Sequence, residues 1–245
     1  MNNLYVVNLK MNLVLSDVAT YVHDINNLIT KTDNVVICPT HIHIPFFSSN
    51  NFKVGAQDLS IYEKGSYTGE VSALQLSNSG VTHTILGHSD RRRLFDETDE
   101  LINIKIKQAL KHDIIPIICL GESKSEKVAL QTTSVLRRRL LDILKDLTKS
   151  ELSKIIIAYE PIWAISTTGT GFTPTAHEID EIVTFIKDIV KSAYKVDIPV
   201  LYGGSVGMKI INQIRELENT DGFLIGAAGL NPEELSSIIN ILEEK

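Results

Sequence analysis

The sequence predicts an α/β protein that folds as a single-domain (β/α)8 barrel. Short apolar runs alternate with longer amphipathic segments from one end of the 245-residue chain to the other. Such alternation indicates parallel strands joined by right-handed helical crossovers. The pattern contains eight strand–helix units, which suits a closed barrel, and barrels of this length commonly form one domain. We therefore expect one domain over residues 1–245, with no linker inside it.

The strands are predicted from the apolar runs and the helices from the amphipathic segments between them. The predicted strands are Leu4–Val7, Val35–Cys38, Lys53–Gln57, His83–Leu86, Ile114–Cys119, Ile155–Tyr159, Pro199–Tyr202 and Gly222–Ile225. Helical patterns lie at residues 16–30, 43–49, 71–79, 98–112, 124–146, 175–194, 207–218 and 232–243. Helix starts are expected at Asp17, Ser123, Thr175 and Asn231-Pro232, and helix ends near Gly80 and Asp113.

An open doubly wound sheet is the structural alternative to a barrel. Such a sheet normally has a glycine-rich dinucleotide-binding turn after its first strand. This chain has Asn8-Leu9-Lys10-Met11-Asn12 at that place, which favours the barrel.

Composition excludes several classes of function. The net charge of −6 argues against nonspecific nucleic-acid binding, which requires a basic surface. No signal peptide is recognisable, and no apolar stretch approaches the ~18 residues of a membrane span. The two cysteines, Cys38 and Cys119, each end an apolar run and are expected to be reduced core thiols. We expect a soluble cytoplasmic protein without a metal site, since no cysteine or histidine cluster has metal-binding spacing.

Barrel enzymes place their catalytic residues at the carboxyl ends of the strands, and three segments at these positions carry reactive side chains. Glu160 follows the apolar strand 155–159 and precedes a proline, so it is a candidate general base. Asn8 and Lys10 follow the first strand with a spacing that points both side chains to one face of an extended chain. Glu160 and Lys10 could each instead be an ordinary solvated charge on the surface, without a catalytic role.

His88 differs from the other histidines because it lies where the fourth strand ends and a turn begins. We expect Ser89 or Asp90 to cap a short helix after it. An imidazole beside a helix N-terminus is disfavoured in its charged form, so His88 is expected to stay neutral and to donate a hydrogen bond.

The loops after the last two strands predict a phosphate site. They read Gly203-Gly204-Ser205 and Gly226-Ala227-Ala228-Gly229. Glycines let backbone amides approach an anion closely, and barrels often bind phosphate with these two loops. The polar segment Ser166–Gly171 is interpreted as part of a lid over residues 163–173 that excludes water from a reactive intermediate.

Taken together, these segments resemble the triosephosphate isomerase family over nearly the whole chain, and hence a TIM barrel. The resemblance rests on Asn8-Leu9-Lys10-Met11-Asn12, Gly55-Ala56-Gln57, Tyr67-Thr68-Gly69-Glu70, Leu86-Gly87-His88-Ser89-Asp90-Arg91-Arg92, Cys119-Leu120-Gly121-Glu122, Tyr159-Glu160-Pro161-Ile162-Trp163-Ala164 and Tyr202-Gly203-Gly204-Ser205-Val206. Their combination in this order is far more specific than any one of them. It implies a cofactor-free homodimer that acts on a phosphorylated triose in glycolysis and gluconeogenesis.

The resemblance also implies roles for individual residues. Glu160 matches the family's catalytic base, His88 its electrophile, and Lys10 with Asn8 its substrate-binding pair. The implied phosphate-binding residues are Ser166, Gly204, Ser205, Gly226 and Ala227. The implied dimer-loop residues are Gln57, Thr68 and Glu70, with Thr68 in the loop that inserts into the partner subunit.

The chain departs from the family pattern at four places. Leu9 replaces a usual tryptophan, and Ala227 replaces a frequent glycine without removing the backbone amide. Asp90 is one methylene shorter than the usual glutamate, which leaves open whether this supporting carboxylate reaches Lys10. The lid begins Ile165-Ser166-Thr167-Thr168 instead of Ile-Gly-Thr-Gly and is about one residue longer.

Two other functions are compatible with parts of the pattern. An isomerase of the same fold for another phosphorylated ketose, such as an erythrulose phosphate, would keep the same base, electrophile, cation and phosphate loops. A catalytically silent barrel that binds phosphorylated ligands or proteins would need no glutamate facing a histidine.

Overall fold

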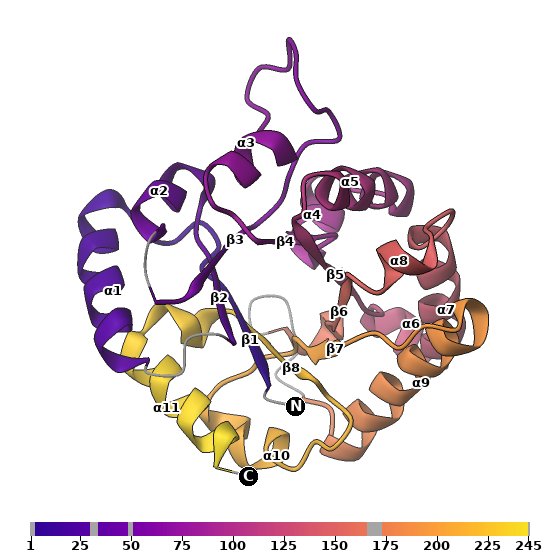
Figure 1. Ribbon diagram of the computed structural model, residues 1–245. Helices are drawn as coiled ribbons and strands as arrows, with labels where there is room; N and C mark the ends of the chain where they lie inside the picture. The colour runs from indigo at the N-terminus through magenta and orange to yellow at the C-terminus, as the bar shows by residue number, and fades with distance from the viewer. Residues whose placement is uncertain (1–2, 30–33, 49–50, 166–172, 245) are drawn as a thin grey trace.

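Parallel strands form a closed barrel in the computed structural model, which describes residues 3–29, 34–48, 51–165 and 173–244. Each strand pairs with the next in sequence order, and the eighth pairs with the first (Figure 1). The strands are β1 (Leu4–Asn8), β2 (Val35–Cys38), β3 (Lys53–Ala56), β4 (His83–Leu86), β5 (Ile115–Leu120), β6 (Ile156–Tyr159), β7 (Val200–Tyr202) and β8 (Gly222–Ile225). The predicted fold class is confirmed, and every predicted strand is found to within one residue at each end.

Helices surround the barrel and cover its outer face (Figure 1). The α-helices are α1 (Leu15–Leu28), α2 (Ile44–Phe47), α3 (Ala73–Asn78), α4 (Ser89–Leu94), α5 (Asp99–Lys111), α6 (Lys124–Val128), α7 (Thr132–Ile143), α8 (Lys149–Leu152), α9 (Ala176–Tyr194), α10 (Ile211–Ile214) and α11 (Pro232–Glu243). The 3-10 helices are η1 (His41–His43), η2 (Ile162–Ala164), η3 (Met208–Ile210) and η4 (Ala227–Leu230).

Most of the helix N-termini predicted from capping residues are found in the structure. Ser123, Thr175 and Asn231 are N-caps whose side chains accept a backbone N–H in the first turn, as predicted. The predicted helix start at Asp17 is wrong, because α1 has Val14 as its N-cap. Asp17 is the third residue of the helix, and its carboxylate accepts the Val14 N–H.

The predicted helix at residues 124–146 is instead divided into α6 and α7. Leu130 lies between them with φ of 57°, a left-handed conformation that an α-helix cannot contain. Leucine is a good helix former, so the sequence alone gave no reason to expect the break.

Buried residues form two layers on either side of the strands. Val6 and Ala158 belong to the cluster inside the barrel, whereas their neighbours Val7 and Tyr159 pack between the strands and the helices. Because successive side chains alternate between the two faces of a strand, a residue two positions after an inward one also points inward. Asn8 follows Val6 in this way and Glu160 follows Ala158, so both are directed into the mouth of the barrel.

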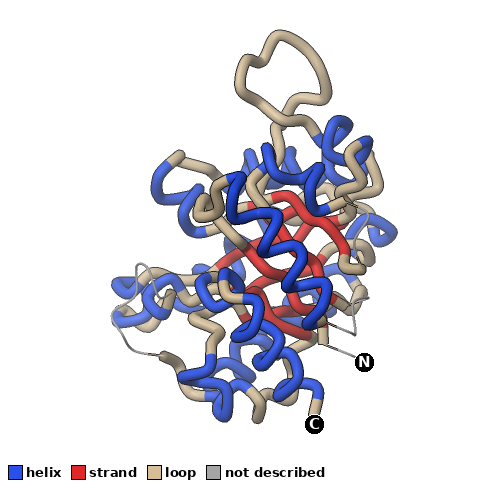
Figure 2. Tube along the Cα trace, turned by 90° about the vertical axis from the view of Figure 1, so that its left-hand side faces the viewer, coloured by secondary structure: helices blue, strands red, loops and turns tan. Residues whose placement is uncertain are grey.

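The structure also bears on the predictions for the thiols and for the membrane-span question. Cys38 and Cys119 are free and buried, as predicted. Figure 2 shows the loop between β3 and α3 extending away from the body of the barrel, and it includes the exposed residues Thr68 and Glu70. None of the helices in the described part of the chain combines the length and the hydrophobicity that crossing a bilayer requires.

Candidate active site

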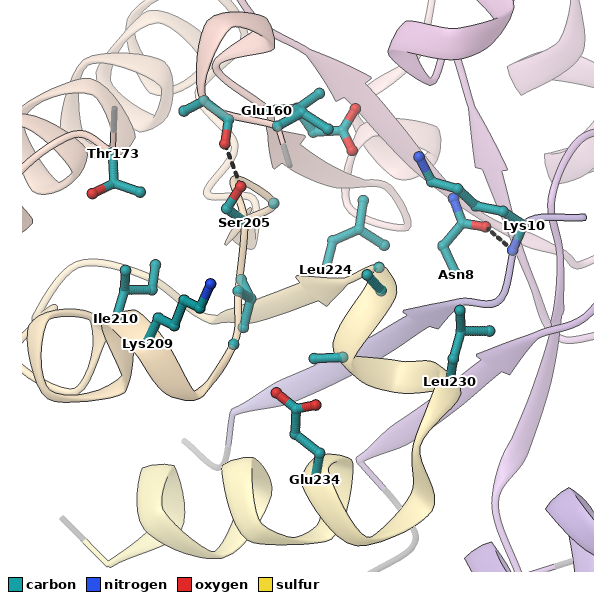
Figure 3. Close-up of a pocket in the computed structure, with 18 of the residues that line it drawn as sticks. Asn8, Lys10, Glu160, Thr173, Ser205, Lys209, Ile210, Leu224, Leu230 and Glu234 are labelled. Atoms are coloured by element: carbon teal, nitrogen blue, oxygen red, sulfur yellow. Dashed lines mark hydrogen bonds between the residues drawn. The ribbon is translucent and has the colours of Figure 1, made fainter. Parts of the chain in front are cut away.

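A cavity of about 790 Å³ opens at the carboxyl ends of the strands. It brings together residues from both ends of the chain, which Figure 3 shows converging from several strands. The lining includes the following predicted site residues: Asn8, Lys10, His88, Glu160, Ser205, Gly226 and Ala227. The side chains that the sequence predicted to act together therefore share one cavity.

Glu160 is a buried acid of this cavity, with 3% of its surface exposed. Its backbone N–H donates to Leu120 O at 2.9 Å, which continues the pairing of β5 with β6 past the last strand residue. Its Oε1 lies 3.4 Å from Nε2 of His88, and its Oε2 is buried without a hydrogen-bond partner among the described residues. A buried carboxylate oxygen without a donor is unusual and suits a group that takes up a proton from a ligand.

The Cys119 thiol lies beneath this carboxylate. Burial raises the pKa of Cys119 well above its ordinary value, and the negative charge of Glu160 raises it further. Cys119 therefore stays a neutral thiol and adds no second negative charge beside the base.

His88 is itself the N-cap of α4, which corrects the expectation that Ser89 or Asp90 would cap this helix. The Asp90 N–H donates to His88 Nδ1 at 3.1 Å. A ring nitrogen that accepts a hydrogen bond carries no proton, so this geometry assigns the neutral ring with its proton on Nε2. That nitrogen is the one that faces Glu160, and it can donate to an oxygen bound between them.

Lys10 adopts a left-handed backbone conformation, with φ of 50°. Such a conformation costs a residue with a Cβ about 1–2 kcal/mol, so neighbouring contacts must hold it. Asn8 Oδ1 accepts the Lys10 N–H at 3.0 Å, and Gln57 Nε2 donates to Lys10 O at 2.8 Å and to Cys38 O at 2.9 Å. Gln57, expected in the dimer loop, thus supports Lys10 of its own chain.

The Asp90 carboxylate reaches Lys10 despite being one methylene shorter than the family's usual glutamate. Lys10 Nζ donates to Asp90 Oδ2 at 2.9 Å, and His88 Nδ1 lies 3.5 Å from the same oxygen. Partial burial is the largest single influence and raises the pKa of Asp90, but the hydrogen bonds and positive charges of its neighbours, Lys10 first among them, together outweigh burial and hold the pKa of this carboxyl below its ordinary value. Asp90 is therefore ionised at neutral pH and positions the ammonium group.

Gly203, the first residue after β7, has to be a glycine because the Glu160 side chain lies too close for a Cβ atom. A Cβ added to Gly203 would lie 2.9 Å from Glu160 Cγ and 3.5 Å from its Oε1, and the first of these distances is too short for real carbon atoms. Gly203 also donates its N–H to Tyr159 O at 2.8 Å, which fixes the loop against β6. The loop after β7 can pass the Glu160 carboxylate only because Gly203 has no side chain.

The predicted phosphate loops follow β7 and β8, and β8 pairs directly with β1, the strand that leads to Asn8 and Lys10. Ser205 has φ of 43°, and its hydroxyl donates to the carbonyl oxygen of Ala164, the last residue of η2. Gly226 and Ala227 follow β8 and line the cavity, whereas Gly204 is not among the described lining residues. A Cβ on Gly204 would meet the Tyr202 hydroxyl at 2.5 Å, so Gly204 permits the turn.

The expected lid at 166–171, including Ser166, lies outside the described residues. The described residue Trp163 precedes it, and Trp163 Nε1 donates to Glu122 Oε1 at 2.7 Å. The Tyr159 hydroxyl lies 3.3 Å from both carboxylate oxygens of Glu122. Burial raises the pKa of Glu122, and these hydrogen bonds partly offset the effect.

Some contacts and lining residues of the site have no local signal in the sequence. The contact of Gln57 with Lys10 joins two segments that are 47 residues apart, which no local pattern predicts. Lys209 and Glu234 also line the cavity, from helices beyond the strand ends where catalytic residues were sought.

Comparison with known proteins finds similarity over nearly the whole chain. Residues 3–242 match the family model described as triosephosphate isomerase. A triosephosphate isomerase from Clostridium botulinum (strain Loch Maree / Type A3) is 40% identical over 242 residues, which are 95% of this chain and 96% of that protein. One from Alkaliphilus oremlandii (strain OhILAs) is 39% identical over the same shares. A crystal structure of triosephosphate isomerase from Bartonella henselae has a TM-score of 0.87 and 28% identity, covering 98% of this chain and 99% of that one.

Proposed function

We propose a mechanism and a set of site residues for this chain, which belongs to the triosephosphate isomerase family. The chain is an isomerase that interconverts dihydroxyacetone phosphate and D-glyceraldehyde 3-phosphate. One observation carries the assignment of residues: Glu160, His88 and Lys10 line a single cavity together with the two glycine-containing loops.

Glu160 is the base in this proposal. A proton next to a carbonyl group is weakly acidic and a carboxylate is a weak base, so the enediolate must be stabilised while it forms. Glu160 takes a proton from C1 of dihydroxyacetone phosphate, the C1–H electron pair forms the C1=C2 bond, and the C2=O π pair moves onto O2. The hydroxyl proton then passes from O1 to O2 beside His88 Nε2, the C1=C2 pair takes the proton back from Glu160 at C2, and the pair left on O1 forms the C1=O1 carbonyl. Its buried carboxylate, with Oε1 3.4 Å from His88 Nε2, supports this role.

His88 stabilises the charge on the substrate oxygens. Its Nε2–H hydrogen-bonds the two oxygens in turn, and Lys10 supplies a fixed positive charge. A carboxylate base beside a neutral imidazole is the established arrangement in this family, and we apply it to these residues. Losing one such preorganised donor typically costs about 3–4 kcal/mol of transition-state stabilisation.

The phosphate group binds at the loops after β7 and β8 in this proposal. Ser205, Gly226 and Ala227 line that side of the cavity, and backbone amides in such loops can surround an anion. Binding energy from the phosphate, which does not react, contributes to catalysis at the carbons. Contacts from Ser166, Gly204 and the lid stay predictions.

The family also suggests the setting in which the enzyme acts. We propose a homodimer in which the loop carrying Thr68 and Glu70 contacts a partner subunit, which suits the exposure of this projecting loop. The proposed reaction moves only protons and therefore requires no cofactor. We further propose a cytoplasmic location, where glycolysis and gluconeogenesis take place.

An assay of the purified protein tests the substrate. Isomerisation is measured with D-glyceraldehyde 3-phosphate and with erythrulose phosphates, and the kcat/KM values are compared. We expect triose phosphate to be preferred by a large factor. A higher kcat/KM for a four-carbon substrate would contradict the proposal, and absence of turnover with every substrate would indicate a binding protein.

A further inference from the structure

The lysines that line the active-site cavity differ in their partners. Among the described lining residues the lysines are Lys10 and Lys209. Lys10 is paired with Asp90 at 2.9 Å. Lys209 is exposed, and no described carboxylate lies within ion-pairing distance of its Nζ. The charge of Lys209 is therefore available to a ligand.

Lys209 lies beside the loop to which the phosphate binding is assigned. It belongs to η3, and only three residues separate it from Ser205 along the chain. In Figure 3 its ammonium end points toward the side of the cavity on which Ser205 lies, while Lys10 lies on the other side. Lys209 thus provides a cation at the end of the cavity away from Lys10.

The carboxylates at the cavity and the net negative charge of the protein disfavour an anionic substrate, so a cation such as Lys209, which has no carboxylate partner among the described residues, matters for binding it. Glu160 and Glu234 both line the cavity, and the positive charge of Lys10 is offset by Asp90. The protein as a whole has a net charge of −6, so a dianionic substrate approaches a molecule that repels it at long range. A single cation at the mouth of a cleft can raise the local concentration of an anion and its association rate.

We propose that Lys209 is a specificity-determining residue that draws the phosphate dianion of the substrate to the loop after β7. The proposal rests on the proposed function, and it adds a residue outside the strand ends to the substrate-binding set. Lys209 acts on the charge of the phosphate and takes no part in the proton transfers.

The test compares Lys209→Gln and Lys209→Glu with a matched control, Lys154→Gln. Lys154 is also exposed but lies just before β6, at the amino ends of the strands, and Lys154→Gln changes the net charge equally. At an ionic strength of about 0.01 M, kcat/KM for D-glyceraldehyde 3-phosphate should fall about three- to tenfold in Lys209→Gln, further in Lys209→Glu, and hardly at all in Lys154→Gln. The deficit should shrink at about 0.15 M, where the Debye length falls from about 30 Å to about 8 Å.

Two further measurements separate a charge effect from a structural one. Slow isomerisation of unphosphorylated glyceraldehyde should be equal in wild type and Lys209→Gln, because that substrate carries no charge. The inhibition constant of inorganic phosphate should rise in Lys209→Gln, and Lys209→Arg should restore wild-type behaviour.

The outcomes distinguish the two proposals. Wild-type turnover of triose phosphate together with an unchanged kcat/KM in Lys209→Gln overturns the role of Lys209 alone. An equal loss with glyceraldehyde overturns it as well, because the substitution then acts through the fold. Failure of the wild type to isomerise any triose phosphate overturns the proposed function itself.

Discussion

Substituting Gly203 by alanine should displace the Glu160 carboxylate, the proposed base, without removing any of the proposed catalytic groups. The added Cβ would lie 2.9 Å from Glu160 Cγ, and ordinary contact begins at 3.4 Å, so the Glu160 side chain must retreat by about 0.5 Å. Leu224 Cβ, at 3.3 Å from the new atom, limits movement of the loop in the other direction. Since a misplacement of about 1 Å can cost about 10²-fold in rate, half of it should lower kcat about tenfold.

The assay for this variant is steady-state isomerisation of D-glyceraldehyde 3-phosphate, with circular dichroism to verify the fold. We expect kcat to fall while KM changes little, because the phosphate contacts are not moved. Gly207→Ala is the matched control in the same loop: its added Cβ would have Ala228 Cβ at 3.8 Å and Glu234 Oε1 at 3.9 Å as its nearest neighbours, both ordinary contacts. A kcat for Gly203→Ala within twofold of that of Gly207→Ala would refute the reasoning.

Three more substitutions test contacts around the site and the fold. Gln57→Met keeps the side-chain length but removes the amide that donates to Lys10 O and Cys38 O, and it leaves Lys10 O with only the longer contact from the Thr40 hydroxyl at 3.3 Å. We therefore expect about 1–2 kcal/mol lower stability in urea unfolding and a lower kcat. Asp90→Asn should lower stability at neutral pH. Because the folded pKa of Asp90 lies below its ordinary value of 3.8, the difference from wild type should be present above pH 3.8 and disappear as the pH falls through the folded value. Leu130→Asn should increase the free energy of unfolding by about 1 kcal/mol and so raise the thermal unfolding temperature, because Leu130 is 91% exposed and asparagine tolerates its φ of 57° better. An unchanged or lower unfolding temperature would show that the backbone at Leu130 is not strained.

The positions of Glu160 and Asn8 could be predicted because they follow from strand periodicity. Each lies two residues beyond an inward-facing strand residue, so the alternation of the strand determines the direction of its side chain. The glycines after β7 and β8 were likewise recognisable, since the place of phosphate loops in a barrel follows from the order of its strands.

Other features depend on contacts that local sequence rules do not contain. Serine and aspartate are the usual N-caps, so the rules favoured Ser89 or Asp90, yet the imidazole of His88 takes this place. The support of Lys10 by Gln57 arises only when β1 and β3 come together at the barrel mouth. The contact of Asp90 with Lys10 joins residues 80 positions apart, and side-chain length alone could not establish that the shorter carboxylate reaches it.

The most direct test of the central claim is the turnover number of Glu160→Gln. This change keeps the size of the side chain and removes its basicity, so kcat with D-glyceraldehyde 3-phosphate should fall by about 10²- to 10⁴-fold while the circular dichroism spectrum stays that of the wild type. Turnover close to that of the wild type would contradict the assignment of Glu160 as the group that carries the proton.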